Sequence, residues 1–228
     1  MAEGKKQMGP PIIGVSKNIA QVRDLISHVA DTGFNVVITG ESGVGKEVIA
    51  QNLYQQSPRV GKPFVKINCA ALPEGLLESE LFGYEQGAFT GAGKKKRGKF
   101  EIAHSGVLLL DEIGDMSLPL QAKLLHVLQG GTFAPLGSEK DITSDTWVLA
   151  ATNHELEEDI KKGLFQNTIR PSFFCQGLRK FSPTGDRNHG GFRVFFLHDG
   201  NDPDAAHIGH DQIRDQQVKP FFFRFNDL

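Results

Sequence analysis

The feature that most constrains the fold is a glycine-rich loop, GESGVGKE, which follows a short apolar run at residues 36–39. Glycines let such a loop wrap closely, so that successive backbone N–H groups point inward at an anion. A helix that starts at the loop adds partial positive charge, and a lysine at its end can reach outer phosphates. An alternative, a glycine-rich turn with an incidental lysine, stays open on the motif alone. The candidate phosphate-binding residues are Gly40, Glu41, Ser42, Gly43, Val44, Gly45, Lys46 and Glu47.

Short apolar runs alternate with helix-forming segments through the first 165 residues. Strands are expected at residues 36–39, 64–68, 107–111 and 147–151. Helices are expected at residues 19–30, 46–56, 76–82, 118–129 and 156–162. This alternation predicts an α/β fold, a parallel sheet with helices on both faces.

Two carboxylates, Asp111 and Glu112, end the third of these strands. Ligands collect at the carboxyl ends of strands in such sheets, so both side chains are expected beside the glycine-rich loop. Asp111 is then the candidate ligand for Mg²⁺, directly or through water. Glu112 is the candidate that orients and polarises an attacking water. Two ordinary carboxylates at a strand end remain the alternative.

The composition favours a cytoplasmic protein. The formal net charge of −2 gives no electrostatic reason to expect non-specific binding of the whole chain to nucleic acid. Two cysteines are too few for a disulfide framework. The N-terminal stretch has no apolar segment typical of a signal peptide, and no apolar run is long enough to cross a membrane.

Four motifs occur in order: GESGVGKE, NCAALPEGLLESELFGYEQGAFTGA, GVLLLDEIGDM and AATNHEL. Together they resemble the central AAA+ domain of sigma-54-dependent transcriptional activators, the bacterial enhancer-binding proteins, over about residues 12–165. Glu at position 47, where most P-loops carry Ser or Thr, is common in that family. The resemblance implies an AAA+ P-loop NTPase with ATP and Mg²⁺ as cofactors. It also implies that ATP binding and hydrolysis, in a self-associated ring, remodel the sigma-54 RNA polymerase holoenzyme, with promoter DNA involved only indirectly.

The resemblance also implies roles for single residues. Ile13 and Gly14, in the segment 12–14, match the part that packs on adenine. Asn68 matches a switch asparagine that holds Glu112 away from water until nucleotide and target are sensed. Asn153 matches the sensor that reads the γ-phosphate. The residues that match the family's sigma-54 contact loop are Gly87, Ala88, Phe89, Thr90, Gly91 and Ala92.

The residues of this loop themselves favour a contact role. A glycine-flanked tip that carries one large aromatic, Phe89, is a plausible binding anchor, although Phe89 folded back into the core is the alternative. The basic run that follows, at residues 94–97, is interpreted as a solvated loop, and contact with promoter DNA or sigma-54 is the weaker hypothesis.

The composition changes after residue 165: residues 166–228 contain no Glu and carry clustered Phe, His, Asp and Arg without helical or strand periodicity. Three segments are therefore expected: an N-terminal extension (1–11), a partial AAA+ domain (12–165) and an atypical tail (166–228). The tail is interpreted as frameshifted or disordered, and a native but divergent C-terminal region is the alternative. No fifth strand, helical lid or arginine-finger segment is recognisable, so the strand at 36–39 is expected to be an exposed edge. The histidines of the tail match no metal-ligand spacing. The alternative function is a non-catalytic nucleotide- and sigma-54-binding module or an inactive fragment.

Overall fold

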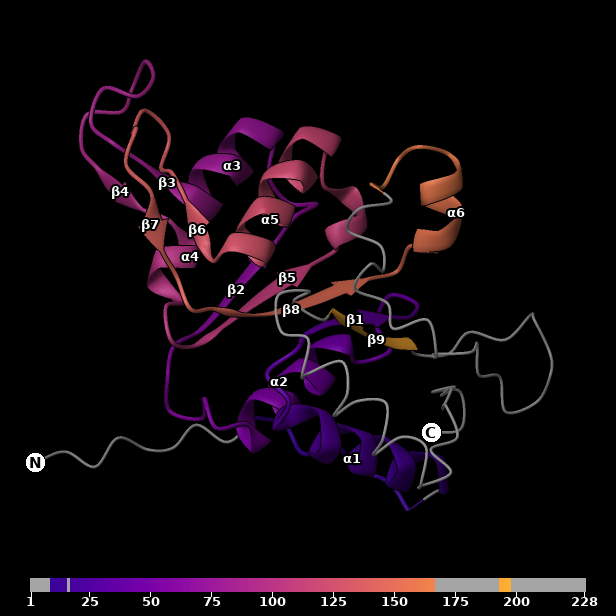
Figure 1. Ribbon diagram of the computed structural model, residues 1–228. Coiled ribbons are helices and arrows are strands. Elements are labelled where there is room, and N and C mark those ends of the chain that lie inside the picture. Colours follow the sequence, from indigo (N-terminus) through magenta and orange to yellow (C-terminus); the bar gives the residue numbers. More distant parts are fainter. Residues whose placement is uncertain (1–8, 16, 167–192, 198–228) are drawn as a thin grey trace, which may run out of the picture.

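A five-stranded sheet forms the centre of the computed structural model, which describes residues 9–15, 17–166 and 193–197 (Figure 1). The strand order is β2-β5-β8-β1-β9. The strands are β1 (Asn35–Thr39), β2 (Phe64–Asn68), β5 (Val107–Asp111), β8 (Trp147–Thr152) and β9 (Arg193–Leu197). The helices are α1 (Lys17–Ala30), α2 (Lys46–Gln56), α3 (Glu74–Phe82), α4 (Lys99–Ile102), α5 (Leu118–Gly130) and α6 (Leu156–Lys161). The predicted α/β architecture is confirmed, and β2, β5, β8 and β1 pair in parallel.

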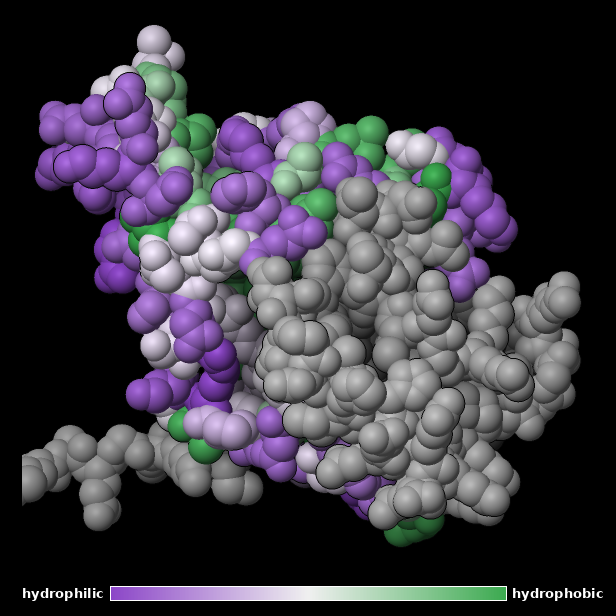
Figure 2. Space-filling view, in the orientation of Figure 1, coloured by the Kyte–Doolittle hydropathy of each residue, from purple (hydrophilic) through white to green (hydrophobic). Residues whose placement is uncertain are grey.

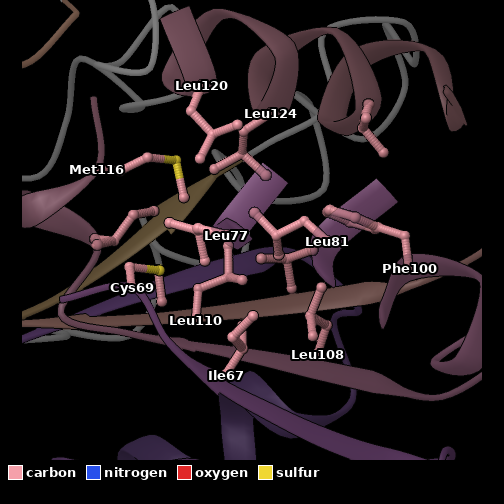
Figure 3. Packing of buried hydrophobic residues seen from close by; sticks show 14 of the residues in the cluster. Ile67, Cys69, Leu77, Leu81, Phe100, Leu108, Leu110, Met116, Leu120 and Leu124 are labelled. Carbon is pink, nitrogen blue, oxygen red and sulfur yellow. The ribbon is translucent and has the colours of Figure 1, made fainter. Parts of the chain in front are cut away.

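The two faces of the sheet carry separate hydrophobic clusters, because successive side chains of a strand point to opposite faces. Val107 and Leu109 of β5 belong to the cluster that packs on α1 and α2. Leu108 and Leu110 belong to the cluster that packs on α3 and α5. Figure 3 shows this second cluster, with leucines from α3 and α5 converging on β5. The near-continuous burial of β5 and β8 explains why both read as uninterrupted apolar runs.

The edge strand of the sheet is not the one expected from the sequence. The strand β1 is not an exposed edge, because β9 pairs with it in antiparallel orientation, with Val36 opposite Phe196 and Ile38 opposite Val194. The expectation of no fifth strand was wrong in this respect, although this strand is antiparallel and lies in the atypical tail. The backbone of β9 thereby provides hydrogen-bond partners for the N–H and C=O groups that β1 would otherwise leave free at the edge. Tail residues 167–192 and 198–228, including His189, lie outside the described residues.

Two small hairpins stand at one end of the molecule, and their two-residue strands were too short to predict. The strands β3 (Gly83–Tyr84) and β4 (Lys96–Arg97) pair with each other, as do β6 (Thr132–Phe133) and β7 (Ile142–Thr143). A bridge between Tyr84 and Leu136 ties the two hairpins together. In Figure 1 both project from the same side of the sheet, near α3 and α4.

Residues 164–166, which follow α6, pack against the core and against α5. Phe165 is buried, and the fully buried Gln121 of α5 donates to the carbonyl oxygens of Met116 and Leu164 at 2.7 and 3.2 Å. Its side-chain oxygen accepts from the backbone N–H of Gln166 at 2.8 Å. Within the described ranges, α6 is the last helix, and none of the helices there is both long and apolar enough to span a membrane.

Candidate functional site

The glycine-rich loop lies between β1 and α2, as predicted. Gly43 and Gly45 have φ values of 82° and 93°, a left-handed conformation that favours glycine. Gly45 is the N-cap of α2, and no side chain caps that helix. The uncapped N-terminus of α2 leaves N–H groups of its first turn available to an anion. A hydrogen bond of 3.1 Å from the N–H of Gly40 to the carbonyl of Thr152 fixes the start of the loop to the end of β8.

Lys46 lies under this loop, with 6% of its surface exposed. Its ammonium donates to the carbonyl oxygens of Gly40 at 2.9 Å and Glu41 at 3.1 Å. It also forms an ion pair with Glu112, 3.7 Å from Oε1. The loop therefore holds its cation on its inner side, next to the carboxylate at the end of β5.

Glu112 adopts a left-handed backbone conformation with φ 53°, which is uncommon for a non-glycine residue. Its other carboxylate oxygen, Oε2, accepts a hydrogen bond of 3.1 Å from the backbone N–H of Asn153. The structure thus brings Lys46, Glu112 and Asn153 together at the carboxyl ends of β5 and β8. Strained backbone of this kind is often found at functional sites.

Asn68 stands at the end of β2, opposite Asp111 in the parallel register. Its side-chain oxygen accepts hydrogen bonds from the N–H groups of Ala70 and Ala71, at 2.9 and 3.0 Å. In this arrangement Asn68 organises the turn that follows its own strand, while Glu112 has other partners. A switch contact between Asn68 and Glu112 therefore stays a prediction.

Lys66 joins the site, although it was not singled out from the sequence. Its ammonium lies 2.7 Å from Oε2 of Glu47 and 3.3 Å from Oδ2 of Asp111. Partial burial lowers the pKa of Lys66, but the hydrogen bonds and negative charges of both carboxylates outweigh it, so the pKa is raised overall. Lys66 lies two residues before Asn68 on β2, hence on the same face. That spacing was the available signal in the sequence.

The segment that precedes α1 is held in place by a second unpredicted residue. Arg23 of α1 donates to the carbonyl oxygens of Ile12 at 2.6 Å and Gly14 at 3.0 Å. Ile12 packs against the hydrophobic cluster under α1 and α2, whereas the Ile13 side chain is 74% exposed. Ile13 is therefore free to contact a ligand from this segment.

A third unpredicted residue, His154, follows Asn153 at the end of β8. Its Nδ1 lies 2.7 Å from Asp159 of α6, and its Nε2 lies 3.4 Å from Asp115 of the 3-10 helix η1 (Ile113–Asp115). These contacts link the loop after β8 to the turn that follows Glu112. Lone histidines give little signal in a sequence, because their partners are set by tertiary packing.

The loop at residues 87–92 closes on itself and presents its aromatic residue. The N–H of Gly87 donates to the carbonyl of Ala92 at 2.8 Å, and the N–H of Ala92 donates to the carbonyl of Phe89 at 3.0 Å. Phe89 is 44% exposed and makes one edge-on contact with Tyr84, with ring centroids 4.9 Å apart. The prediction of an exposed Phe89 is confirmed.

The basic run beside this loop is largely paired. Lys95 binds Glu85 at 2.7 Å, Lys96 binds Glu80, and Arg97 binds Glu101 at 2.7 Å. In Figure 2 hydrophilic residues accordingly cover one side of the projecting end of the molecule that carries the two hairpins. These ion pairs favour the interpretation of residues 94–97 as a solvated loop.

Cys69 directly follows Asn68, the last residue of β2, and is buried in the hydrophobic cluster of Figure 3. Burial raises the pKa of its thiol to about 12, and the negative charges of Asp111, Asp115 and Glu112 act in the same direction. Because the thiolate is the reactive form, we expect Cys69 to react with DTNB at pH 8 at least about a hundredfold more slowly in the folded than in the urea-unfolded chain. A Cys175→Ser background leaves one thiol to observe. Equal rates in the two states would contradict this prediction.

Comparison with known proteins shows the family of the chain. The sigma-54 interaction domain family matches residues 12–170. The Nif-specific regulatory protein of Azotobacter vinelandii is 48% identical over 166 residues, which are 73% of this chain and 32% of that protein. The anaerobic nitric oxide reductase transcription regulator NorR of Shigella sonnei is 50% identical over 177 residues, 77% of this chain and 35% of that protein. The chain thus spans about a third of the length of these relatives.

Solved structures show the same fold. The crystal structure of NtrX from Brucella abortus superimposes with a TM-score of 0.63 and 38% identity, covering 68% of this chain and 34% of NtrX. Its complex with ATP gives a TM-score of 0.63 and 37% identity, covering 68% of this chain and 33% of NtrX. The fold is accordingly that of an AAA+ P-loop NTPase domain, represented in part. The chain belongs to the sigma-54 interaction domain family.

Proposed function

We propose that this chain is an ATP-binding, sigma-54-interacting domain that couples ATP binding and hydrolysis to remodelling of sigma-54 RNA polymerase for transcription activation. One observation carries the proposal: Lys46, Glu112 and the backbone of Asn153 form a single bonded network under an uncapped, glycine-rich helix N-terminus. An exposed aromatic loop on the same domain supplies a separate contact surface.

The residues of the site fit a nucleoside triphosphate. The open loop around Gly43 and Gly45 offers backbone N–H groups, and Lys46 can exchange its carbonyl partners for phosphate oxygens. Ile13 would pack on the base, with Arg23 holding its segment. Nucleotide binding in the family is supported by the NtrX structures in complex with ADP and with ATP.

The site also fits Mg²⁺ as a companion of the phosphates. Asp111 is the carboxylate that ends β5, where Lys66 is its ion-pair partner at 3.3 Å. The described residues contain no cluster of three or more His, Cys, Asp or Glu side chains that could hold an ion alone. Mg²⁺ commonly keeps several waters and binds through one or two carboxylates together with substrate phosphates. Such an ion would neutralise charge on the phosphates during hydrolysis.

For hydrolysis, we propose that Glu112 orients the attacking water and takes up its proton. The N–H of Asn153 holds the Glu112 carboxylate at 3.1 Å, and Lys46 lies on its other oxygen at 3.7 Å. Asn153 would report the γ-phosphate, and Asn68 would leave its turn to restrain Glu112 in the waiting state. Each of these steps uses a residue at the carboxyl end of a parallel strand, where ligands bind in such sheets.

Self-association into a ring, indirect involvement of promoter DNA and a cytoplasmic location belong to the same proposal. We assign the ATPase unit to residues 12–165, since Phe165 still packs in its core. Residues 1–11 are an extension of this unit. Residues 166–228 are a separate segment of atypical composition that contributes β9 to the sheet.

The contact with sigma-54 can be tested at Phe89. We expect Phe89→Ala to weaken binding of purified sigma-54, in the presence of a non-hydrolysable ATP analogue, by about tenfold or more, because an aromatic anchor can supply 2 kcal/mol or more of binding energy. Surface plasmon resonance with immobilised sigma-54 measures it.

Leu76→Ala is the matched control, since Leu76 of α3 is similarly exposed, at 48%, but lies outside the loop. It should leave the affinity unchanged. Equal affinities of the Phe89→Ala variant and the unmodified chain would remove the assigned contact.

A further inference from the structure

Lys66 occupies an unusual position for a basic side chain in a phosphate-binding site. It bridges Glu47, in the first turn of α2, and Asp111, the candidate ligand for Mg²⁺. Glu47 is held from its other side, because Nε2 of Gln51 donates to its Oε1 at 3.3 Å. Glu47 therefore holds the ammonium of Lys66, and Gln51 in turn holds the carboxylate of Glu47.

The sheet explains why Lys66 reaches this place. In the parallel register Lys66 lies opposite Leu109, and Asn68 lies opposite Asp111, so all four residues share one face of the sheet. Leu109 belongs to the cluster that packs against α2. A long side chain from this position of β2 meets the first turn of α2 and the strand end of β5 together.

The charged side chains form two separate groups, each with one lysine. Lys46 lies on Glu112, whereas Lys66 lies on Glu47 and Asp111. Mg²⁺ binds carboxylate oxygens at about 2.0–2.1 Å, so an ion on Asp111 would stand close to an ammonium that is 3.3 Å from the same carboxylate. Two cations that share one carboxylate repel each other.

We propose that Lys66 acts as a built-in cation that competes with Mg²⁺ for Asp111 and so sets how strongly ATP binding depends on Mg²⁺. This inference rests on the proposed function. When no metal is bound, Lys66 offsets one of the two negative charges of Glu47 and Asp111, and so lowers their repulsion of the phosphates. When Mg²⁺ binds, Lys66 has to give up Asp111 and keeps Glu47.

The test compares the dissociation constant of a fluorescent ATP analogue, mant-ATP, measured in EDTA and in excess Mg²⁺. We expect Lys66→Met to raise the ratio of the dissociation constant in EDTA to that in Mg²⁺ by about threefold to tenfold. This is the size of effect that loss of one partly screened charge at this distance should have. Both constants should move, with weaker binding in EDTA and stronger binding in Mg²⁺.

Two controls accompany this variant. Lys66→Arg keeps the charge and should stay within about twofold of the unmodified ratio. Lys123→Met removes a lysine that is ion-paired with Glu78 away from the site, and should leave the ratio unchanged. Circular dichroism checks that each variant is folded, and Lys66→Gln, which also removes the charge, replaces Lys66→Met if the methionine variant is not folded.

The outcomes separate this inference from the proposed function. If the unmodified chain binds no mant-ATP in either condition, the proposed function fails and this inference with it. If the chain binds mant-ATP but Lys66→Met leaves the ratio unchanged, the competition is wrong while the proposed function stands. A lowered ratio also overturns the competition, since Lys66 would then hold Asp111 in place for the metal.

Discussion

Replacing Lys46 by alanine should lower the affinity for ATP by about a hundredfold or more. The ammonium of Lys46 donates to the carbonyl oxygens of Gly40 and Glu41 at 2.9 and 3.1 Å, and phosphate oxygens can replace these acceptors. Hydrogen bonds to charged groups contribute about 1.5–3 kcal/mol each, and a loss of about 3 kcal/mol corresponds to this change in affinity. Isothermal titration calorimetry with Mg²⁺ and ATP measures the difference.

A general effect of lost charge has to be separated from this local one. Lys123→Ala removes the same charge from an exposed ion pair with Glu78, and its ATP affinity should equal that of the unmodified chain. The thermal unfolding of the Lys46→Ala variant shows whether it remains folded. An affinity within threefold of the original, in a folded Lys46→Ala variant, would rule out this loop as the phosphate site.

The central elements of the fold could be predicted because local and global preferences agree there. The strands β1, β5 and β8 are buried on both faces, so their apolar runs are unambiguous. The helix α2 starts at the residue expected from the glycine-rich loop. The helix α3 begins at Glu74, two residues before the expected start, because the acidic first turn after Pro73 adds to the apolar pattern.

Contacts between distant residues could not be predicted in the same way. The antiparallel pairing of β9 with β1 joins segments that no local pattern connects, and its run Arg193–Leu197 shows no alternation. The structure places Asn68 and Asp111 at the ends of β2 and β5, and Asn153 directly after β8, as the sequence predicted, while their roles stay predictions. The partners of Lys66 and His154 depend on side-chain directions across two or three elements. The side-chain oxygen of Asn68 accepts hydrogen bonds from the turn that follows β2 instead of reaching Glu112.

The start of β5 is the place where a single methyl group should cost most stability. A Cβ on Gly106 would lie 2.1 Å from the carbonyl oxygen of Pro63, which is backbone and cannot turn away. That oxygen accepts a hydrogen bond of 2.8 Å from the N–H of Val107 at the start of the β2–β5 pairing. The carbonyl of Gly106 accepts from Trp147 at 3.1 Å and from Arg59 at 3.1 Å. Relieving the overlap would therefore disturb three strands together.

We expect Gly106→Ala to lower the free energy of unfolding by about 3 kcal/mol or more, since overpacking alone typically costs 1–3 kcal/mol and the start of a strand pair is lost as well. Urea unfolding followed by circular dichroism measures it. Gly75→Ala is the matched control, because a Cβ there meets nothing within 4 Å and lies in α3. Alanine favours a helix over glycine by up to about 1 kcal/mol, so the two substitutions should change stability in opposite directions. Equal midpoints for the Gly106→Ala variant and the unmodified chain would mean that β2 and β5 do not approach each other as closely as described.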